Sequence, residues 1–472
     1  MKTRIAFTVA LLWLGMGSAE AKLDHFQHIV IVVQENRTPD NLFNALCVSH
    51  RLCSVNPNSK QYDIQTEHWL DKHAAGGITE PFAVPLAGNF TPAHNHSAFV
   101  DQCDFDAQSG QCRMDAASDV HCKGQCPANA SYGYVDNSDG SLNPYLTIAT
   151  HYGWANYMFQ TNQGPSFPAH QFIFGASSAP SENDDHTGYF ASEDKTDPGS
   201  DGCTAEPNET VQIIDPNGHE DSQNRIFPCF EHATLSDLLD GNQLSWRFYA
   251  PSEGSMWNAP SAISHICVPQ NGHCTGAGFE QNVDVDPSDV LTDIKNCQLR
   301  NVVWVTPTGQ NSDHPMGNTG GGPSWVASII NAIGNSPCKN ADKSTYWHST
   351  AILVTWDDWG GWYDHEPPEF LPYPEGGYQY GFRVPFLFMS AYTPKGYIDN
   401  KRNDFGSIAR FVESNFGISE GALTFADSRA VDDLWEFVDK AKAPRPFRKI
   451  QAPMSAKHFL EDKSAPTPPD DD

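Results

Sequence analysis

The chain has 472 residues, with 58 acidic and 29 basic side chains and a formal net charge of −29 at pH 7. This length allows one large domain or two to three ordinary ones, each with a sizeable core. A surface this acidic argues against nucleic acid as a partner, because phosphate backbones bind Lys- and Arg-rich faces, and it equally disfavours tight adhesion to anionic lipid.

The first 21 residues have the pattern of a secretory signal. Lys2 and Arg4 precede an apolar run over 5–16, and Ala19 and Ala21 form an A-x-A-type cleavage site. We therefore expect a secreted or periplasmic protein, whose mature chain has a net charge of about −30. Since no other apolar run approaches the roughly 20 residues of a membrane span, we expect no integral membrane segment.

The twelve cysteines predict disulfides, as is typical of exported proteins. Pairing by nearest neighbours gives Cys47–Cys53, Cys103–Cys112, Cys122–Cys126, Cys203–Cys229, Cys267–Cys274 and Cys297–Cys338. Spacing alone does not fix this connectivity. A structural zinc site is the weaker alternative, because the cysteines lack the accompanying C-x₂-C and H-x₃-H ligand sets.

The first predicted strand covers 26–33, a near-continuous β-branched run typical of a strand buried on both faces of a mainly parallel sheet. Thr38 then fits a helix N-cap and Pro39 a first helical residue. Glu35 and Asn36 would lie between strand and helix, either in a functional site or in an ordinary polar loop.

The stretch 44–145 is rich in Gly, Pro, Asn, Asp, His and Cys, and we interpret it as a disulfide-pinned insertion over the site. Within it, His94 and His96 lie close together, either as functional side chains or as solvent-exposed imidazoles. A helix is predicted over 144–159 from apolar positions spaced three and four apart.

A turn at Gly164-Pro165 separates that helix from the next one, whose first turn accommodates Pro168. Ser166 would therefore lie at a helix N-terminus, where unpaired N–H donors and the helix dipole attract anions. A serine at this position is either an N-cap or a nucleophile.

The second half alternates strands with helices. A second irregular insertion is expected at 181–283, with a helix starting at 234–239 and a strand at 244–249 inside it. Further strands are predicted at 301–306, 351–356 and 384–389, and helices at 324–333, 405–416 and 428–440. This order indicates an α/β sandwich with a mostly parallel central sheet and helices on both faces, whose ligand crevice lies outside the carboxyl ends of the strands.

The strand at 351–356 ends in two adjacent carboxylates, Asp357 and Asp358. Neighbouring carboxylates repel each other unless a cation or a shared proton lies between them, so the pair is a candidate metal or acid/base site. The alternative is a β-turn with both side chains solvated.

Several polar groups are predicted to converge at this sheet edge. They are Glu35, Asn36, Ser166, Asp357 and Asp358, with His94 and His314 nearby and His186 or His365 as further candidates. The oxygen ligands suit one divalent Mg²⁺, Ca²⁺ or Mn²⁺ ion, whereas direct histidine ligation would favour Zn²⁺. A serine oxygen bound to such an ion becomes a nucleophile at ambient pH.

Two motifs resemble those of the bacterial phosphoesterase family, the phospholipase C and acid phosphatase superfamily. Residues 34–40, QENRTPD, are similar to its E-N-R-S-F-D motif, and residues 357–365, DDWGGWYDH, to its D-[DE]-x-G-G-[FW]-[YF]-D-H motif. In the first motif Thr38-Pro39 replaces Ser-Phe. The G-P-S-x-P segment has serine where other members have threonine, which is more similar to the acid phosphatase branch.

The resemblance implies an alkaline-phosphatase-like core over 22–447, followed by a partly disordered tail at 448–472. It implies metal ligands at Glu35, Asn36, Ser166, Asp357 and Asp358, and phosphate-facing histidines at His94 and His314. We expect Ser166 to be the nucleophile and His314 to protonate the leaving alcohol. The substrate would be a phosphate ester, either a phospholipid or a phosphomonoester.

A different class of protein remains open at this point. The chain could be a secreted, disulfide-stapled binding protein whose acidic clusters hold structural Ca²⁺ without catalysis. No sequence feature specifies an oligomeric state.

Overall fold

The computed structural model describes residues 24–47, 52–194, 201–370 and 379–466. The predicted signal at 1–21 and the last residues of the predicted tail lie outside the described residues. In the described part of the chain, no helix is long and apolar enough to cross a membrane.

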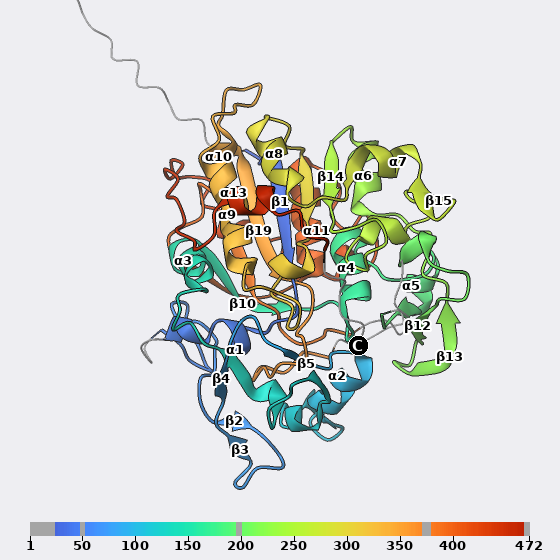
Figure 1. The fold of residues 1–472 in the computed structure, drawn as a ribbon, viewed down its shortest axis with the longest axis vertical. Helices are drawn as coiled ribbons and strands as arrows, with labels where there is room; N and C mark the ends of the chain where they lie inside the picture. The colour runs from blue at the N-terminus through green and yellow to red at the C-terminus, as the bar shows by residue number, and fades with distance from the viewer. Residues whose placement is uncertain (1–23, 48–51, 195–200, 371–378, 467–472) are drawn as a thin grey trace, which may run out of the picture.

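The centre of the molecule is an eight-stranded sheet (Figure 1). In spatial order its strands are β17 (Val283–Asp284), β14 (Trp246–Tyr249), β18 (Val302–Val305), β1 (His28–Gln34), β19 (Thr350–Trp356), β20 (Phe386–Met389), β10 (Gly153–Phe159) and β21 (Tyr397–Asp404). Only β20 runs antiparallel to its neighbours. Every residue of β1 and β19 is buried, as expected for central strands covered on both faces.

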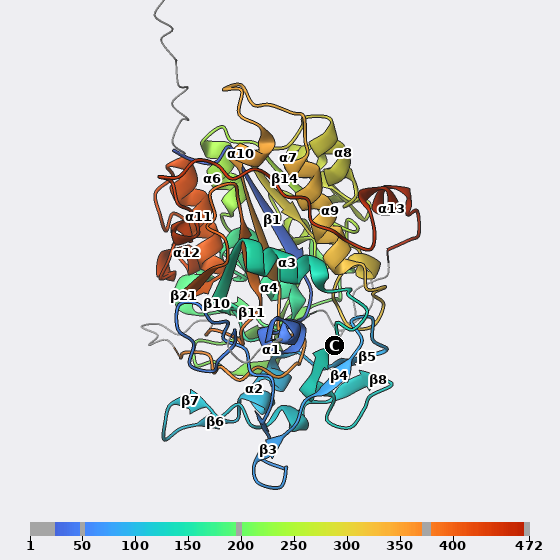
Figure 2. The same ribbon diagram turned by 90° about the vertical axis from the view of Figure 1, so that its left-hand side faces the viewer.

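Helices cover both faces of this sheet (Figure 2). One layer contains α3 (Asn143–His151), α8 (Asp289–Lys295), α9 (Gly322–Gly334), α10 (Tyr346–Ser349) and α13 (Ala456–Glu461). The other contains α4 (Ser166–Gly175), α6 (Leu235–Gly241), α11 (Phe405–Phe416) and α12 (Ala426–Arg429). The predicted α/β sandwich with a mostly parallel sheet is confirmed.

Most of the predicted elements are present. The structure confirms the strands at the start of the chain and around 244–249, 301–306, 351–356 and 384–389, and the helices at 234–239, 324–333 and 405–416. Thr38 caps α1 (Pro39–Leu42) by accepting from the Asn41 N–H, as its position predicts.

The helix predicted over 144–159 is wrong in its second half. Helix α3 ends at His151, and β10 follows at once between β20 and β21. Gly153 lies so close to the Phe437 ring that a Cβ would come within 2.5 Å of it, which leaves room only for a glycine in this strand. The apolar residues after it face both sides of the sheet.

The helix predicted over 428–440 is also wrong. The chain forms only α12 and a 3₁₀ turn, η7 (Trp435–Phe437). Leu434 has φ of 62°, which no α-helix contains, and Asp432 pairs with Lys401 of β21. In the predicted tail, α13 packs Phe459 against Trp325 of α9.

The two insertions consist of short elements pinned by disulfides, and all six predicted pairings are confirmed. The first contains η1 (Asn44–Cys47), β2 (Trp69–Leu70), β3 (Ile78–Thr79), β4 (Phe82–Val84), β5 (Phe90–Pro92), α2 (His96–Cys103), β6 (Phe105–Asp106), β7 (Gln111–Cys112), η2 (Ala117–Asp119), β8 (Cys122–Gly124), η3 (Ala130–Tyr132) and β9 (Gly133–Val135). It lies at the end of the sheet to which β1 points (Figures 1 and 2).

The second insertion contributes β14 and β17 to the edge of the main sheet. It also contains α5 (Asp184–Thr187), β11 (Phe190–Ala191), η4 (Gly202–Thr204), β12 (Val211–Ile214), β13 (Glu220–Ile226), η5 (Ala259–Ala262), β15 (Val268–Gln270), β16 (His273–Thr275) and α7 (Ala277–Asn282). The remaining 3₁₀ turn, η6 (Gly309–Asn311), follows β18. Part of the second insertion reaches the start of α4, where the Phe167 N–H donates to Asp194, so both insertions can supply walls to a site there.

Candidate metal and phosphate site

The site begins where the two central strands end. Residue Gln34 of β1 is paired with Trp356 of β19, so the next residues of both strands emerge side by side. The pairing continues past the strand ends, because the Asp357 N–H donates to the Gln34 carbonyl (3.0 Å) and the Arg37 N–H to the Asp358 carbonyl (3.0 Å). The register of two strands therefore places Glu35 and Asn36 against Asp357 and Asp358.

Asn36 connects the two aspartates. Its backbone N–H donates to Asp357 Oδ1 (3.0 Å), and its side-chain Nδ2 donates to Asp358 Oδ1 (3.1 Å) and His94 Nε2 (2.8 Å). Its φ of 62° is in the left-handed region, which asparagine tolerates better than most residues. The close approach of Gly360 fixes this conformation, because a Cβ there would lie 2.4 Å from the Asn36 carbonyl oxygen.

Ser166 is the first residue of α4, as the turn before it predicts. Its hydroxyl donates to Asp358 Oδ2 (3.2 Å), which connects the helix start with the strand-end carboxylates. The next amide of the helix, Phe167 N–H, donates to the Asp194 carboxylate (2.8 Å). That N–H is therefore already bonded to an anionic group.

The two predicted phosphate-facing histidines are neighbours. The ring centroids of His94 and His314 are 5.8 Å apart. His94 Nδ1 donates to the Pro92 carbonyl (3.1 Å), so the Nε2 that contacts Asn36 is an acceptor. His314 Nδ1 donates to the Pro315 carbonyl, which orients the ring at the end of the loop after β18. The seven predicted site residues thus lie together at one edge of the sheet: Glu35, Asn36, His94, Ser166, His314, Asp357 and Asp358.

A group of buried polar atoms in this site has no hydrogen-bond partner among the described residues. They are Glu35 Oε1 and Oε2, Asn36 Oδ1, His170 Nε2 and Asp357 Oδ2. Buried polar atoms without partners are rare in folded proteins, and a cation between them satisfies them together. One ligand atom from each of Glu35, His170 and Asp357 lies within 4.8 Å of the others, so this buried cluster could hold a metal ion.

The charge balance of the cluster agrees with such a site. Burial and the neighbouring Asp357 raise the pKa of Glu35 well above its usual value. Burial lowers the pKa of His170 to about 4, so its imidazole is neutral near pH 7. The carboxylates therefore receive no compensating charge from this histidine at neutral pH, and an added cation would stabilise their ionised forms.

Sequence reasoning missed two residues of the site, His170 and Trp257. His170 lies one helical turn after Ser166, and this i,i+4 spacing was the signal that could have identified it. Trp257 comes from the second insertion, and its ring centroid lies 6.4 Å from that of His170 and 6.2 Å from that of His314. No local pattern connects Trp257 with the site, because only the fold brings it there.

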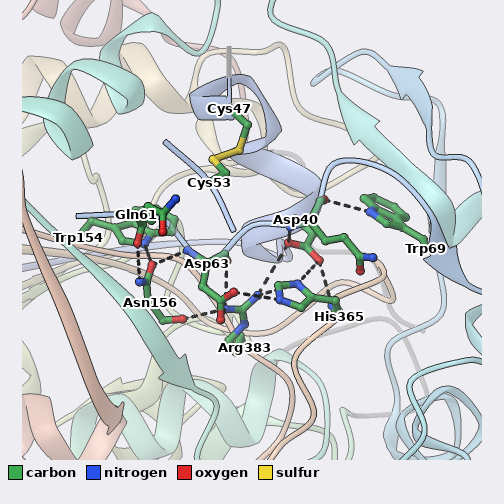
Figure 3. Close-up of a disulfide and its surroundings, with 11 residues drawn as sticks. Asp40, Cys47, Cys53, Gln61, Asp63, Trp69, Trp154, Asn156, His365 and Arg383 are labelled. Atoms are coloured by element: carbon green, nitrogen blue, oxygen red, sulfur yellow. Dashed lines mark hydrogen bonds and ion pairs between the residues drawn. A yellow bond between two sulfur atoms is a disulfide. The ribbon is translucent and has the colours of Figure 1, made fainter. Parts of the chain in front are cut away.

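The other two candidate histidines lie elsewhere. His186 of α5 is more than half exposed and faces Asp185. His365 is buried between the carboxylates of Asp40 (2.8 Å) and Asp63 (3.1 Å), in an ion-pair network that also contains Arg383 (Figure 3). The last two residues of the second motif, Asp364 and His365, therefore belong to a structural ion-pair network and not to the site.

The first motif, residues 34–40, also contains both site residues and structural residues. Glu35 and Asn36 belong to the site, whereas the Arg37 guanidinium donates to the backbone carbonyls of Asp313 (2.9 Å) and Leu86 (3.1 Å). Arg37 thereby ties the loop that carries His314 to the first insertion. The Arg37 guanidinium is therefore bonded to backbone carbonyls and not to the acidic side chains of the site.

The fold and site define an α/β protein with a serine hydroxyl at a helix N-terminus, beside a buried cluster of acidic and imidazole groups that could hold a metal ion. The chain belongs to the Phosphoesterase family, whose sequence profile matches residues 26–419. This match confirms the resemblance inferred from the two motifs and extends it over nearly the whole described chain.

Several similar proteins are phospholipases C. Phospholipase C B of Mycobacterium tuberculosis is 27% identical over 271 residues, which cover 49% of each chain, so this chain spans about half the length of that relative. Phospholipase C A of the same organism is 21% identical over 92% of this chain and 81% of its own length. Non-specific phospholipase C6 of Arabidopsis thaliana is 26% identical over 32% of each chain.

Solved structures overlap only loosely with this one. A protein of the alkaline phosphatase superfamily from Vibrio parahaemolyticus aligns over 58% of this chain and 60% of its own, with 12% identity and a TM-score of 0.30. A sulfatase from Pseudoalteromonas sp. aligns over 64% and 67%, with 9% identity and a TM-score of 0.33. The description of the fold therefore rests on the sheet and helices of this chain.

Proposed function

We propose that this protein is an exported, metal-dependent phosphoesterase that cleaves phosphate esters through a phosphoseryl intermediate on Ser166. The observation that carries the proposal is the position of the Ser166 hydroxyl. It lies at the start of α4 and donates to Asp358, which belongs to the same strand-end group as the buried Glu35 and Asp357 oxygens without partners. Ser166 is not the N-cap of this helix, because Pro165 occupies that position and no side chain caps it there.

In the first step the Ser166 oxygen attacks phosphorus, and its proton moves towards the Asp358 carboxylate that already accepts it. The bond from phosphorus to the leaving oxygen breaks, and the leaving alcohol takes a proton from Nε2 of a His314 imidazolium, whose Nδ1–H stays bonded to the Pro315 carbonyl. In the second step water attacks the phosphoseryl group and gives a proton to the now neutral His314. The Ser166 oxygen leaves phosphorus and takes back its proton from Asp358, which releases the phosphate product and restores both groups. His94 orients Asn36 through its Nε2 and borders the phosphate position from the other side.

The metal ligands in this proposal are Glu35, Asn36, Ser166, Asp357 and Asp358. A divalent ion held there would lower the pKa of the serine hydroxyl and offset negative charge on the phosphoryl oxygens. Few basic groups are available to offset the phosphoryl charge, since the chain is strongly acidic. Arg37, which is near the site in sequence, already donates to backbone carbonyls. A cation bound by acidic side chains therefore explains how an acidic protein accepts an anionic substrate.

The substrate is a phosphate ester of the phospholipase C or acid phosphatase type. The relatives named phospholipase C support a phospholipid, and the serine in the G-P-S-x-P segment supports a phosphomonoester. Six disulfides and the N-terminal signal pattern support export to an oxidising compartment. A calcium-stabilised binding protein without catalysis is less consistent with the Ser166–Asp358 contact, which such a protein does not need.

The experiment is an activity screen on metal-stripped protein. An aryl phosphomonoester, an aryl phosphodiester and phosphatidylcholine are each tested after chelation and after add-back of single divalent ions. We expect turnover of at least one ester that disappears on chelation and returns with one or more ions. Turnover that persists after exhaustive chelation contradicts metal dependence, and no turnover with any ion contradicts the proposed function.

A further inference from the structure

His170 is a buried group beside the site that the predicted ligand set does not include. Its side chain is only 1% exposed, and its Nε2 has no hydrogen-bond partner. That nitrogen lies 3.4 Å from Glu35 Oε1 and 3.6 Å from Asp357 Oδ2, both of which also lack partners. Three unsatisfied buried atoms from three segments therefore face one another.

These separations suit ligands of a shared ion. Two ligand atoms about 2.1 Å from a metal, at tetrahedral to octahedral angles, lie about 3.0–3.4 Å apart. The Glu35–His170 distance is within that range and the Asp357–His170 distance is slightly beyond it. The Trp257 ring lies at 25° to the imidazole with the centroids 6.4 Å apart, and Nε2 is directed at the two carboxylates.

The other buried acid–histidine groups provide a contrast. Asp40, Asp63, Asp364 and His365 also form clusters with metal-ligand spacing, but Arg383 lies among them and donates to Asp63 and Asp364 (Figure 3). In the described part of the chain no lysine or arginine forms an ion pair with Glu35 or Asp357. The network around His365 contains its own cation, whereas the His170 cluster does not.

We propose that His170 Nε2 is a direct ligand of the metal ion, beside the oxygen ligands, and that this nitrogen directs the site towards first-row transition ions such as Zn²⁺, Mn²⁺ or Co²⁺. Imidazole suits these ions, whereas Mg²⁺ and Ca²⁺ take oxygen ligands almost exclusively. The inference rests on the proposed function in that the ion is the one that serves Ser166. It keeps Mn²⁺ from the expectation drawn from the oxygen ligands alone, and it replaces Mg²⁺ and Ca²⁺ with Zn²⁺ and Co²⁺.

The test measures metal binding rather than turnover. Metal-free wild type, His170→Gln and His232→Gln are titrated with Co²⁺, Zn²⁺, Mg²⁺ and Ca²⁺ by calorimetry, and the Co²⁺ complexes are compared by visible absorption. His232 is a suitable control because it is also buried, with an Nε2 that lacks a partner, but its Nδ1 donates to the Ala233 carbonyl away from the cluster.

We expect His170→Gln to weaken Co²⁺ and Zn²⁺ binding by about tenfold or more and to change the Co²⁺ spectrum, with a much smaller change for Mg²⁺ and Ca²⁺. His232→Gln should match wild type. An unchanged Co²⁺ spectrum and unchanged affinities in His170→Gln would overturn the proposal, as would a wild type that binds none of the four ions.

X-ray absorption of the Zn²⁺-loaded wild type gives a second test that needs no variant to fold. Imidazole scattering supports the proposal, and a shell of oxygen ligands alone contradicts it. An ion bound through His170 in a protein without ester turnover would leave this inference intact and refute the proposed function.

Discussion

The Ser166 hydroxyl donates to Asp358 Oδ2 across 3.2 Å, although the two residues are 192 positions apart in the chain. The contact joins the start of α4 to the end of β19, and Asp358 is held for it by the Gly360 N–H (2.7 Å) and by Asn36 Nδ2. A carboxylate fixed by two other donors keeps a constant position relative to the serine. This pre-arranged pair is what the proposed first step requires.

Replacement of Asp358 should impair chemistry more than folding. Asp358→Asn keeps the shape but removes the charge that accepts the serine proton, so we expect kcat to fall by about 10²–10⁴-fold. The measurement is steady-state hydrolysis of the ester identified by the activity screen. Asp185→Asn, a change at a buried aspartate of α5, is the control and should retain wild-type turnover. Equal activity of the two variants would contradict the role of Asp358.

Asn36 offers a pair of substitutions that separates backbone strain from lost side-chain contacts. Asn36→Gly and Asn36→Ala both remove the hydrogen bonds to Asp358 and His94, so both should lose about hundredfold or more in turnover. Only alanine is strained at φ of 62°, so Asn36→Ala should be less stable than Asn36→Gly by about 1 kcal/mol in urea unfolding. Near-normal turnover of Asn36→Gly would show that the side chain is dispensable.

Gly360 tests the close packing beneath the site. Gly360 and Gly417 both have positive φ, but only at Gly360 would a Cβ meet backbone, 2.4 Å from the Asn36 carbonyl oxygen. Gly417→Ala should therefore lower the free energy of unfolding by about 1 kcal/mol through strain alone. Gly360→Ala should lower it by about 1–3 kcal/mol more and displace Asn36. Similar unfolding free energies for the two variants would contradict this prediction, because they would show that the loop accommodates the Cβ at position 360 without further loss of stability.

The network around His365 predicts how stability depends on pH. Although burial opposes protonation, Asp40 and Asp63 raise the pKa of His365 to about 10, against 6.5 for an ordinary histidine, with Arg383 and Glu366 also nearby. Below pH 6.5 both folded and unfolded chains are protonated, so the stabilisation is fully present. From pH 6.5 to about 10 only the folded chain keeps the proton, so stability falls as pH rises.

The expected contribution is a few kcal/mol at most, measured as the free energy of unfolding in urea at pH 6, 7.5 and 9. His365→Gln removes the titrating group, so its stability should decline less steeply over this range than that of wild type. Parallel pH profiles of the two proteins would refute the assignment of this decline to His365.

The sequence predicted β1, β18 and β19 well because these central strands are buried on both faces and are rich in β-branched residues. It did not predict the edge strands β17 and β21, which are partly exposed. It failed at β10, where Trp154, Met158 and Phe159 fit a helical spacing as well as an alternating one. The pairing of β10 with β20 and β21, together with the packing of Gly153 against Phe437, decides for the strand. Near the chain end, apolar residues at 428–440 suggested a helix, but Asp432 binds Lys401 and Leu434 turns the chain.

Most of the predicted site residues could be collected from the sequence because they follow a predicted strand or start a predicted helix, whereas His94 was suggested by its position near His96 in the first insertion. Their mutual distances could not, since they depend on the register of β1 against β19. His170 was overlooked because a histidine inside an apolar helix is usually a core residue, and its partners Glu35 and Asp357 come from two other strands. His365 was a candidate by proximity, but its contacts with Asp40 and Asp63 arise only in the folded chain.

The most direct test of the account is whether Ser166 carries the phosphoryl group. Metal-loaded wild type is mixed with the hydrolysed ester, quenched in acid during turnover and digested, and the peptide that contains Ser166 is examined by mass spectrometry. The account predicts a phosphoryl adduct on Ser166 in wild type, and in Ser166→Ala a folded, metal-binding protein without turnover. A Ser166→Ala protein that keeps more than about a tenth of wild-type kcat, or an adduct on another residue, would contradict it.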